Sequence, residues 1–335
     1  MPFSHHDATP SPEHPFAEYV RILGKGKKGA RPLTQDEARA AMGMILHGEV
    51  LPVQLGAFLM LMRIKEETPE ELAGFAQAAQ ALFAIDAPGL VDLDWATYAG
   101  KRRHLPWFLL SARLLADHGI SIFMHGATGH AADRLYTEQM LPYLGLSVAQ
   151  SIDEARQQLV EHRFSYLGLQ HFCAPLYDII ELRPILGLRS PVHTLVRLLN
   201  PFNAVHSIQG IFHPNYRPVH QQAAALLKQP HMAVLKGEGG ETERSPDRDC
   251  LVQSVHNGEL SDENWPAMFS HRYVKPEQLD PKYWLEVWQG QTEDAYAKAS
   301  VIATAAVALK LLGKAETQDA AHALAAKYWA ERNRY

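Results

Sequence analysis

Positively charged side chains gather in three places of a chain that is acidic as a whole. The 335 residues hold 32 Lys and Arg against 37 Asp and Glu, which gives a formal net charge of -5. The first place is residues 25–31 and the second is residues 101–103. The third is a stretch without any Asp or Glu, from 182 to 237. Cations grouped without acids create a local positive surface, and such a surface binds the phosphates of a polyanion without reading its sequence. The predicted phosphate contacts are Lys25, Lys27, Lys28, Arg31, Lys101, Arg102, Arg103, Arg189, Arg197 and Lys236.

Each group also has a plainer interpretation. Residues 25–31 could form only a solvated turn between two helices, because charge runs usually do. The arginines of the acid-free stretch could cap helices or pair with distant acids. Trp107 and Phe108 follow the second group, and we expect both in the core rather than as platforms on which bases stack.

The composition limits the class of protein. Apolar residues make up 47% of the chain and charged residues 21%, a balance typical of globular proteins. Two cysteines far apart, Cys173 and Cys250, match neither a disulfide framework nor a zinc spacing, so we expect a reducing, cytoplasmic setting and no metal. No apolar run is long enough to cross a bilayer. Residues 1–13 are expected to be a disordered polar tail.

Helical periodicity dominates the N-terminal part. Thr34 with Glu37, and Thr68 with Glu71, have the spacing of capping boxes and predict two helix starts. The segment 51–65 between them is almost entirely apolar, so it must be buried in its own core or against a second subunit. After Pro88-Gly89, short apolar runs alternate with helical ones, which indicates an α/β sheet. From about residue 282 the pattern is helical to the end.

The order of these motifs resembles the anthranilate phosphoribosyltransferase superfamily over residues 16–332. The resemblance rests on GEVLPVQLGAFLMLMRIKEETPEELAGF, LRPILGLRSPVHTLVRLLNP and TAAVALKLLGKA. It implies an α/β fold with a small all-α domain and a central, mainly parallel sheet flanked by helices. The small domain is expected at 14–85 with 184–203, where homodimers would form, and the large domain at 86–183 with 204–335.

The motifs that hold the substrate in that superfamily are degraded. Its GTGGD turn is replaced by residues 98–102, which read Tyr-Ala-Gly-Lys-Arg, and its KHGNR motif by residues 124–128, which read Met-His-Gly-Ala-Thr. The Asp-Glu pair that holds Mg²⁺ falls in residues 236–243, with at most one carboxylate in register. The remnants of a ligand site that the resemblance implies are Gly100, His125, Gly126, Arg183 and Glu241.

Cations in place of the lost motifs resemble the YbiB-type nucleic-acid-binding branch of the superfamily. The resemblance implies a non-catalytic homodimer that binds DNA or RNA largely without sequence preference. We expect single strands to be favoured, because an interdomain cleft is narrow. The rival interpretation is an active phosphoribosyltransferase that uses phosphoribosyl pyrophosphate and Mg²⁺, supported by the surviving remnants. A purely structural or regulatory dimer is a third.

Overall fold

Four helices form the N-terminal unit of the structure, a computed structural model that describes residues 12–26, 28–83, 85–129, 131, 133–274 and 279–334. The helices are α1 (Ala17–Gly24), α2 (Gln35–Leu46), α3 (Pro52–Lys65) and α4 (Pro69–Gln80). Both predicted capping boxes are confirmed: Thr34 caps α2 and Thr68 caps α4, each with its glutamate three residues on. The predicted tail at residues 1–13 lies outside the described residues up to residue 11, and Glu13 forms an ion pair with Arg21.

A seven-stranded sheet forms the centre of the rest of the described chain. Its spatial order is β3-β2-β1-β4-β5-β6-β7. The strands are β1 (Leu93–Thr97), β2 (Ile122–Gly126), β3 (Phe164–Gly168), β4 (His206–Ile211), β5 (His231–Lys236), β6 (Cys250–His256) and β7 (Glu259–Trp265). Strands β1 to β5 run parallel to one another. Strand β6 pairs antiparallel with β5, and β7 pairs antiparallel with β6. The predicted two-domain α/β architecture is therefore confirmed.

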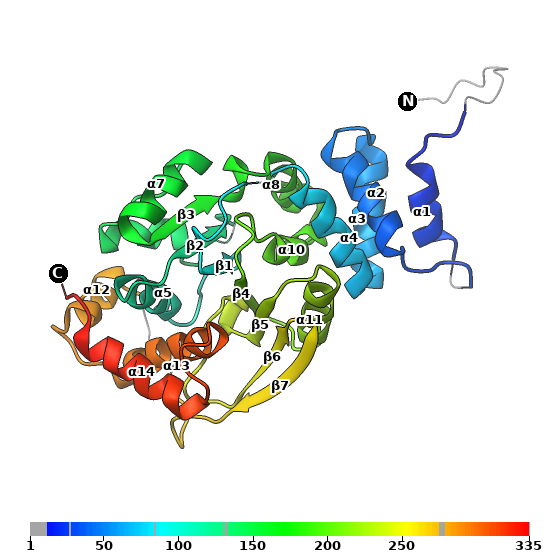
Figure 1. Cartoon of the computed structure of the whole chain (residues 1–335). Coiled ribbons are helices and arrows are strands. Elements are labelled where there is room, and N and C mark those ends of the chain that lie inside the picture. Colours follow the sequence, from blue (N-terminus) through cyan, green and yellow to red (C-terminus); the bar gives the residue numbers. More distant parts are fainter. Residues whose placement is uncertain are drawn as a thin grey trace.

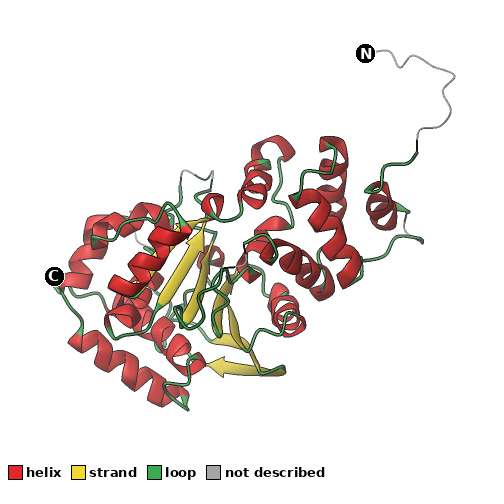
Figure 2. Ribbon diagram, turned by 45° about the horizontal axis from the view of Figure 1, so that its top comes forward, coloured by secondary structure: helices red, strands yellow, loops and turns green. Residues whose placement is uncertain are grey.

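Helices cover both faces of this sheet (Figures 1 and 2). One face packs against α5 (Trp107–Asp117), α12 (Pro281–Gln289), α13 (Ala295–Leu311) and α14 (Gln318–Glu331). The other face packs against α7 (Ile152–His162), α8 (Ala174–Glu181) and α11 (Tyr216–Leu226), and its core continues into the N-terminal helices. Side chains of β2 alternate between the two cores, with Ile122 and Met124 in one and Phe123 in the other, as the pleat of a strand requires.

Short helices between residues 183 and 198 connect the two parts. They are α9 (Arg183–Leu186), α10 (Val192–Leu195) and a 3-10 turn at Val196–Leu198. Helix α10 contacts both α4 and α8, and α11 contacts α4. The loops that follow the parallel strands β1, β2, β4 and β5 meet at one edge of the sheet, where open α/β sheets bind ligands. No helix within the described ranges is both long and apolar enough to cross a membrane.

Gly74 marks the closest approach of α4 to α2. A Cβ atom at this position would lie 2.2 Å from the backbone oxygen of Gln35. Gly74→Ala is therefore expected to lower the free energy of unfolding by about 1–3 kcal/mol, because the helices must move apart. The measurement is urea unfolding followed by circular dichroism.

Gly43, in α2, is the matched control. A Cβ atom there would meet no atom within 4 Å. Since alanine favours a helix more than glycine does, Gly43→Ala is expected to raise the free energy of unfolding by up to about 1 kcal/mol. A Gly74→Ala variant as stable as the parent would contradict the packing of α2 on α4.

Candidate functional site

A buried ammonium group lies at the sheet edge where the degraded glycine turn follows β1. The Lys101 side chain is fully buried, and its Nζ lies 2.5 Å from Glu243 Oε1 and 3.0 Å from Glu238 Oε2. The second oxygen of Glu243 accepts a hydrogen bond of 2.9 Å from the backbone N–H of Phe108. Burial opposes the charge on Lys101, but the two carboxylates outweigh it and raise its pKa above the ordinary value. The Lys101 ammonium group therefore stays charged at neutral pH, while burial raises the pKa of Glu243.

The backbone amides of the same turn point at a carboxylate of the protein itself. The Oε1 atom of Glu241 accepts hydrogen bonds of 2.6 Å from both Ala99 N and Gly100 N. From the other side, Arg134 Nη1 donates to the backbone oxygens of Ala99 at 2.8 Å and Gly100 at 3.1 Å. An anion approaching these amides would have to displace the buried Glu241 side chain.

These contacts correct one prediction from the sequence. The basic run predicts that Lys101 contacts phosphate, but its ammonium group is enclosed and neutralised by two carboxylates, so that prediction is wrong. The neighbouring Arg102 and Arg103 are exposed, as the prediction requires of them. Arg102 forms an exposed ion pair of 2.7 Å with Asp133, a kind of contact that contributes little stability and opens easily.

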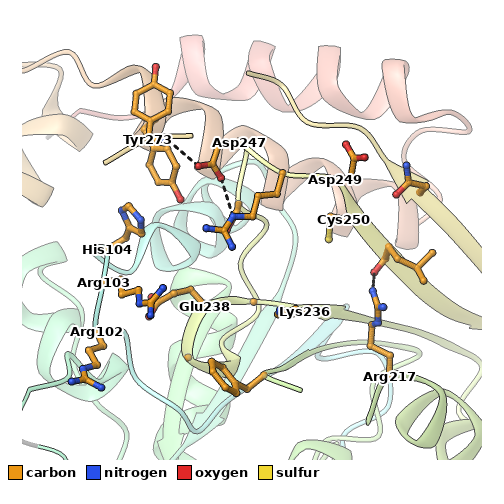
Figure 3. Close-up of a pocket in the computed structure, with 18 of the residues that line it drawn as sticks. Arg102, Arg103, His104, Arg217, Lys236, Glu238, Asp247, Asp249, Cys250 and Tyr273 are labelled. Carbon is orange, nitrogen blue, oxygen red and sulfur yellow. Dashed lines mark hydrogen bonds and ion pairs between the residues drawn. The ribbon is translucent and has the colours of Figure 1, made fainter. Parts of the chain in front are cut away.

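A cavity of about 650 Å³ opens above this turn. Figure 3 shows Arg102, Arg103 and His104 on one side of it, Arg217 on the opposite side and Lys236 between them. The cations that line it are Arg102, Arg103, Arg134, Arg217, Lys236 and Arg248. They face three carboxylates, those of Glu238, Asp247 and Asp249, so the wall carries an excess of three positive charges.

The carboxylates of this wall are already engaged. Glu238 lies against Lys101, and Asp247 lies 3.6 Å from Arg248 and accepts a hydrogen bond from Tyr273 N. Asp249 accepts a hydrogen bond of 2.9 Å from Ala267 N. Lys236 and Arg103 are exposed and form no ion pair with any described residue. The other four cations of the wall already contact oxygens of the protein. Lys236 and Arg103 are therefore the side chains most available to an anion.

Arginines of the acid-free stretch converge beside this cavity. Burial lowers the pKa of Arg189 to about 10, and the positive charges of Arg183, Arg197 and Arg134 contribute to the same shift. Arg197 is pinned by hydrogen bonds from its guanidinium to the backbone oxygens of Gly210 and His193. Arg183, Arg189 and Arg197 do not line the cavity itself, and Arg183 and Arg189 border a separate small crevice.

The N-terminal basic group lies elsewhere. Both views place α1 and the segment after it at the outer edge of the helical unit, away from the sheet (Figures 1 and 2). Lys25 and Lys28 are exposed, and Lys27 lies outside the described residues. Arg31, predicted to belong to an acid-free group, forms a two-point ion pair of 2.7 Å with Glu37. The structure does not bring this group to the cavity.

The surviving remnants of the ligand site have structural reasons to persist. His125 is buried, with Nδ1 2.7 Å from the Tyr98 hydroxyl and Nε2 3.4 Å from Asp94. A Cβ atom on Gly126 would lie 2.1 Å from the backbone oxygen of Thr97, so only glycine fits between β1 and β2. Gly100 has a φ of +66°, a backbone conformation that favours glycine whether or not a ligand binds there.

Arg183 borders a crevice of about 20 Å³. The superfamily resemblance places this arginine near the carboxylate of anthranilate. Such a volume holds about one water molecule and no aromatic acid. Of the five remnants, Gly100, His125, Gly126 and Glu241 are therefore held in internal contacts or closely packed. The fifth, Arg183, borders a space too small for an aromatic acid.

The residues at the degraded metal motif do not fit a magnesium site. Mg²⁺ is usually held by one or two carboxylates together with the substrate's phosphates. Here the carboxylates of Glu238 and Glu243 hold Lys101 between them, and that of Glu241 holds two backbone amides. Among the described residues, no group of three or more His, Cys, Asp or Glu side chains is arranged to hold a metal ion.

Several residues of the cavity were not found from the sequence. Arg134 and Arg248 lie among acids in the chain, and only folding turns them toward the cations from other loops. Tyr273 and Tyr296 come from segments far from any basic run. Trp107 and Phe108, expected in the core, are buried.

Fold and site together define a protein with the architecture of a phosphoribosyltransferase and a substrate cradle filled by its own side chains. Residues 17–82 match the helical bundle domain of a glycosyl transferase family, and residues 108–331 match the α/β domain of that family. The chain belongs to this family.

The relatives and solved structures agree with this assignment. The chain is 29% identical to the uncharacterized protein YbiB of Escherichia coli (strain K12), over 60% of this chain and 64% of YbiB, which is less than two thirds of that relative's length. It is 30% identical to an uncharacterized protein of Aquifex aeolicus (strain VF5), over 72% of this chain and 73% of the relative. Anthranilate phosphoribosyltransferase of Anaeromyxobacter sp. (strain Fw109-5) is 30% identical over 62% of each chain.

Two solved structures share the fold. Anthranilate phosphoribosyltransferase (TrpD) from Thermus thermophilus has a TM-score of 0.76 and 20% identity, with 95% of each chain covered. The Saccharomyces cerevisiae enzyme in complex with PRPP and Mg has a TM-score of 0.74 and 18% identity, over 94% of this chain and 93% of that one. At these identities the likeness concerns the fold alone.

The buried ion pair makes a prediction about stability. Lys101→Met would leave Glu243 buried without its cation, and we expect the free energy of unfolding to fall by about 3–5 kcal/mol. Urea unfolding measures it. Adding Glu243→Gln removes the stranded charge, so the double variant should regain much of the loss.

Arg102→Met is the matched control for this prediction. It removes a neighbouring cation whose ion pair is exposed, and the expected loss is at most about 1 kcal/mol. Equal losses in the Lys101→Met and Arg102→Met variants would contradict the central role of the buried ammonium group.

Proposed function

We propose that this protein binds single-stranded nucleic acid, DNA or RNA, largely without sequence preference and without catalysing a reaction. The observation that carries the proposal is the cavity in which six cations face three carboxylates that are already engaged. Cations that neutralise phosphates gain affinity by releasing counterions, whatever the base sequence. An acidic chain has no global field for this purpose, so the attraction must be local.

The arrangement of the cations supports a strand rather than a small anion. Arg217 and Lys236 line one part of the cavity, Arg102 and Arg103 another, and Arg134 lines it as well. Spaced cations along a concave surface suit the successive phosphates of a backbone. A concave site encloses a single strand, whereas a duplex would meet only its rim.

A homodimer through the helical unit is part of the proposal. On and next to α3, apolar side chains are left in contact with solvent: Leu51 is 53% exposed, Val53 76% and Ile64 82%. The inner side of the same helix is buried through Phe58 and Met62. A helix that is apolar on both sides supports packing against a second copy of the chain.

The salt dependence of binding tests the main proposal. A fluorescent single-stranded oligonucleotide should bind with a log affinity that falls linearly with log salt concentration. Arg102→Gln with Arg103→Gln should reduce the slope by about 1.4, since each phosphate contact on a single strand contributes about 0.7. At roughly 0.1 M salt the same change weakens binding on the order of 10- to 30-fold.

Two further pairs of substitutions serve as controls. Lys314→Gln with Lys327→Gln removes the same charge from exposed positions on and after the C-terminal helices, and should leave the slope unchanged. Lys25→Gln with Lys28→Gln asks whether the N-terminal basic group contributes. If the Arg102 and Arg103 substitutions act no more strongly than those at Lys314 and Lys327, the cavity is not the binding surface. Absence of any binding would favour a purely structural dimer.

The alternative function, phosphoribosyl transfer, has its own test. The Saccharomyces cerevisiae structure contains PRPP and Mg, but here Glu241 holds the amides of the turn and Lys101 lies between the carboxylates. We therefore expect no saturable heat when phosphoribosyl pyrophosphate and MgCl₂ are titrated by isothermal calorimetry. A saturable one-site isotherm that EDTA abolishes would restore the enzyme hypothesis.

A further inference from the structure

A second cavity, of about 390 Å³, adjoins the basic one and has a different character. It is lined mainly by aromatic side chains. His104, Tyr273 and Tyr296 line both cavities and so form the wall between them. The remaining lining residues are Leu105, Trp107, Val274, Asp280, Tyr283 and Asp294.

The shared wall is built of rings in contact, one pair stacked and one tilted. The rings of His104 and Tyr296 lie 4.6 Å apart at an interplanar angle of 20°, and that of Tyr273 lies 5.2 Å from Tyr296. Trp107 is buried beneath them as the first residue of α5, and Tyr296 is buried as well. Tyr273 is only partly buried, and its ring also contacts those of Phe269 at 4.8 Å and His271 at 4.9 Å. A further planar group would extend this cluster of rings at the exposed part of Tyr273.

The polar groups of this cavity accept hydrogen bonds and carry negative charge. Asp280 and Asp294 cap helices α12 and α13, and the Tyr283 hydroxyl donates to Asp294 at 2.9 Å. Burial, with a contribution from Lys101, lowers the pKa of His104 to about 4, so its ring is neutral at pH 7. The cavity therefore repels phosphate and suits an uncharged planar group that donates N–H bonds.

We propose that this aromatic cavity receives one unstacked nucleobase of the strand whose phosphates lie in the neighbouring basic cavity. The inference rests on the proposed function. It follows from the juxtaposition of an aromatic, acceptor-bearing cavity with a cationic one across a shared wall of rings, because a nucleotide joins a flat N–H donor to an anion. A wholly apolar ligand would make no use of the cations next door.

The contribution of the base is measured with two strands of equal length and equal charge. One is an adenine homopolymer, and the other carries abasic sugars on the same phosphate backbone. The parent protein should bind the adenine strand roughly 5- to 100-fold more tightly, the range that stacking on an aromatic side chain supports. Tyr273→Ala should remove most of this preference, whereas Tyr273→Phe, which keeps the ring, should retain it.

Further readouts separate a base contact from a loss of structure. Tyr273→Ala should leave the affinity for the abasic strand and its salt slope as in the parent, and its thermal unfolding should match that of Tyr273→Phe. A single 2-aminopurine in the strand should lose fluorescence on binding to the parent and not on binding to Tyr273→Ala. If Tyr273→Ala is unstable, His104→Ala replaces it in the same comparison.

The outcomes distinguish this inference from the function on which it rests. If neither strand binds, nucleic-acid binding itself is wrong. If both strands bind the parent equally tightly and salt-dependently, the strand is held by its phosphates alone, and the aromatic cavity is not a nucleobase site.

Discussion

The buried contact of Lys101 with Glu243 and Glu238 is the interaction on which the rebuilt cleft depends. It joins the turn after β1 to the loop after β5, segments separated by more than a hundred residues. Glu241, from the same loop, satisfies the amides of the same turn. In the superfamily that the sequence resembles, a diphosphate meets such amides and a metal meets such carboxylates. Here a carboxylate and an ammonium group of the chain perform both neutralisations, so the fold keeps its electrostatic balance without a ligand.

This internal neutralisation explains why the surface above the turn is positive. The carboxylates of the loop after β5 hold Lys101 and backbone amides. Outside them, Arg102 forms only an exposed ion pair with Asp133, and Arg103 forms no ion pair with any described residue. Charged groups that have partners inside the protein gain nothing from an external ion, whereas exposed cations lose only weak hydration and mobile counterions when a phosphate approaches. The loop after β5 therefore occupies the place where a small anion would bind, and it leaves exposed cations available to a polyanion.

Local sequence patterns predicted the architecture well. The site could be predicted only in part, because it depends on contacts between residues far apart in the chain. Thr34 and Thr68 act within one helical turn, so their capping boxes could be read directly from their spacing. The β6–β7 hairpin escaped prediction although Asn257-Gly258, both at positive φ, is a strong turn signal between two strand-forming runs. In the run Lys101–Arg103, nothing local reveals that the first cation turns inward, because its partners come from a loop more than 130 residues away. Arg134 and Arg248 escaped for the same reason.

The wall shared by the two cavities constrains how a strand could be recognised. His104 follows the basic run directly, so the backbone that places Arg103 in one cavity also places an imidazole ring against Tyr296 in the other. Phosphate contacts fix the position of a strand, and stacking fixes the plane of a base. Neither distinguishes one base from another. Base-specific readout needs donors and acceptors matched to base edges. The described lining offers carboxylate acceptors at two places only, Asp280 and Asp294, which suits tolerance of several bases more than selection of one. A site of this construction holds a strand in register while leaving its sequence unread.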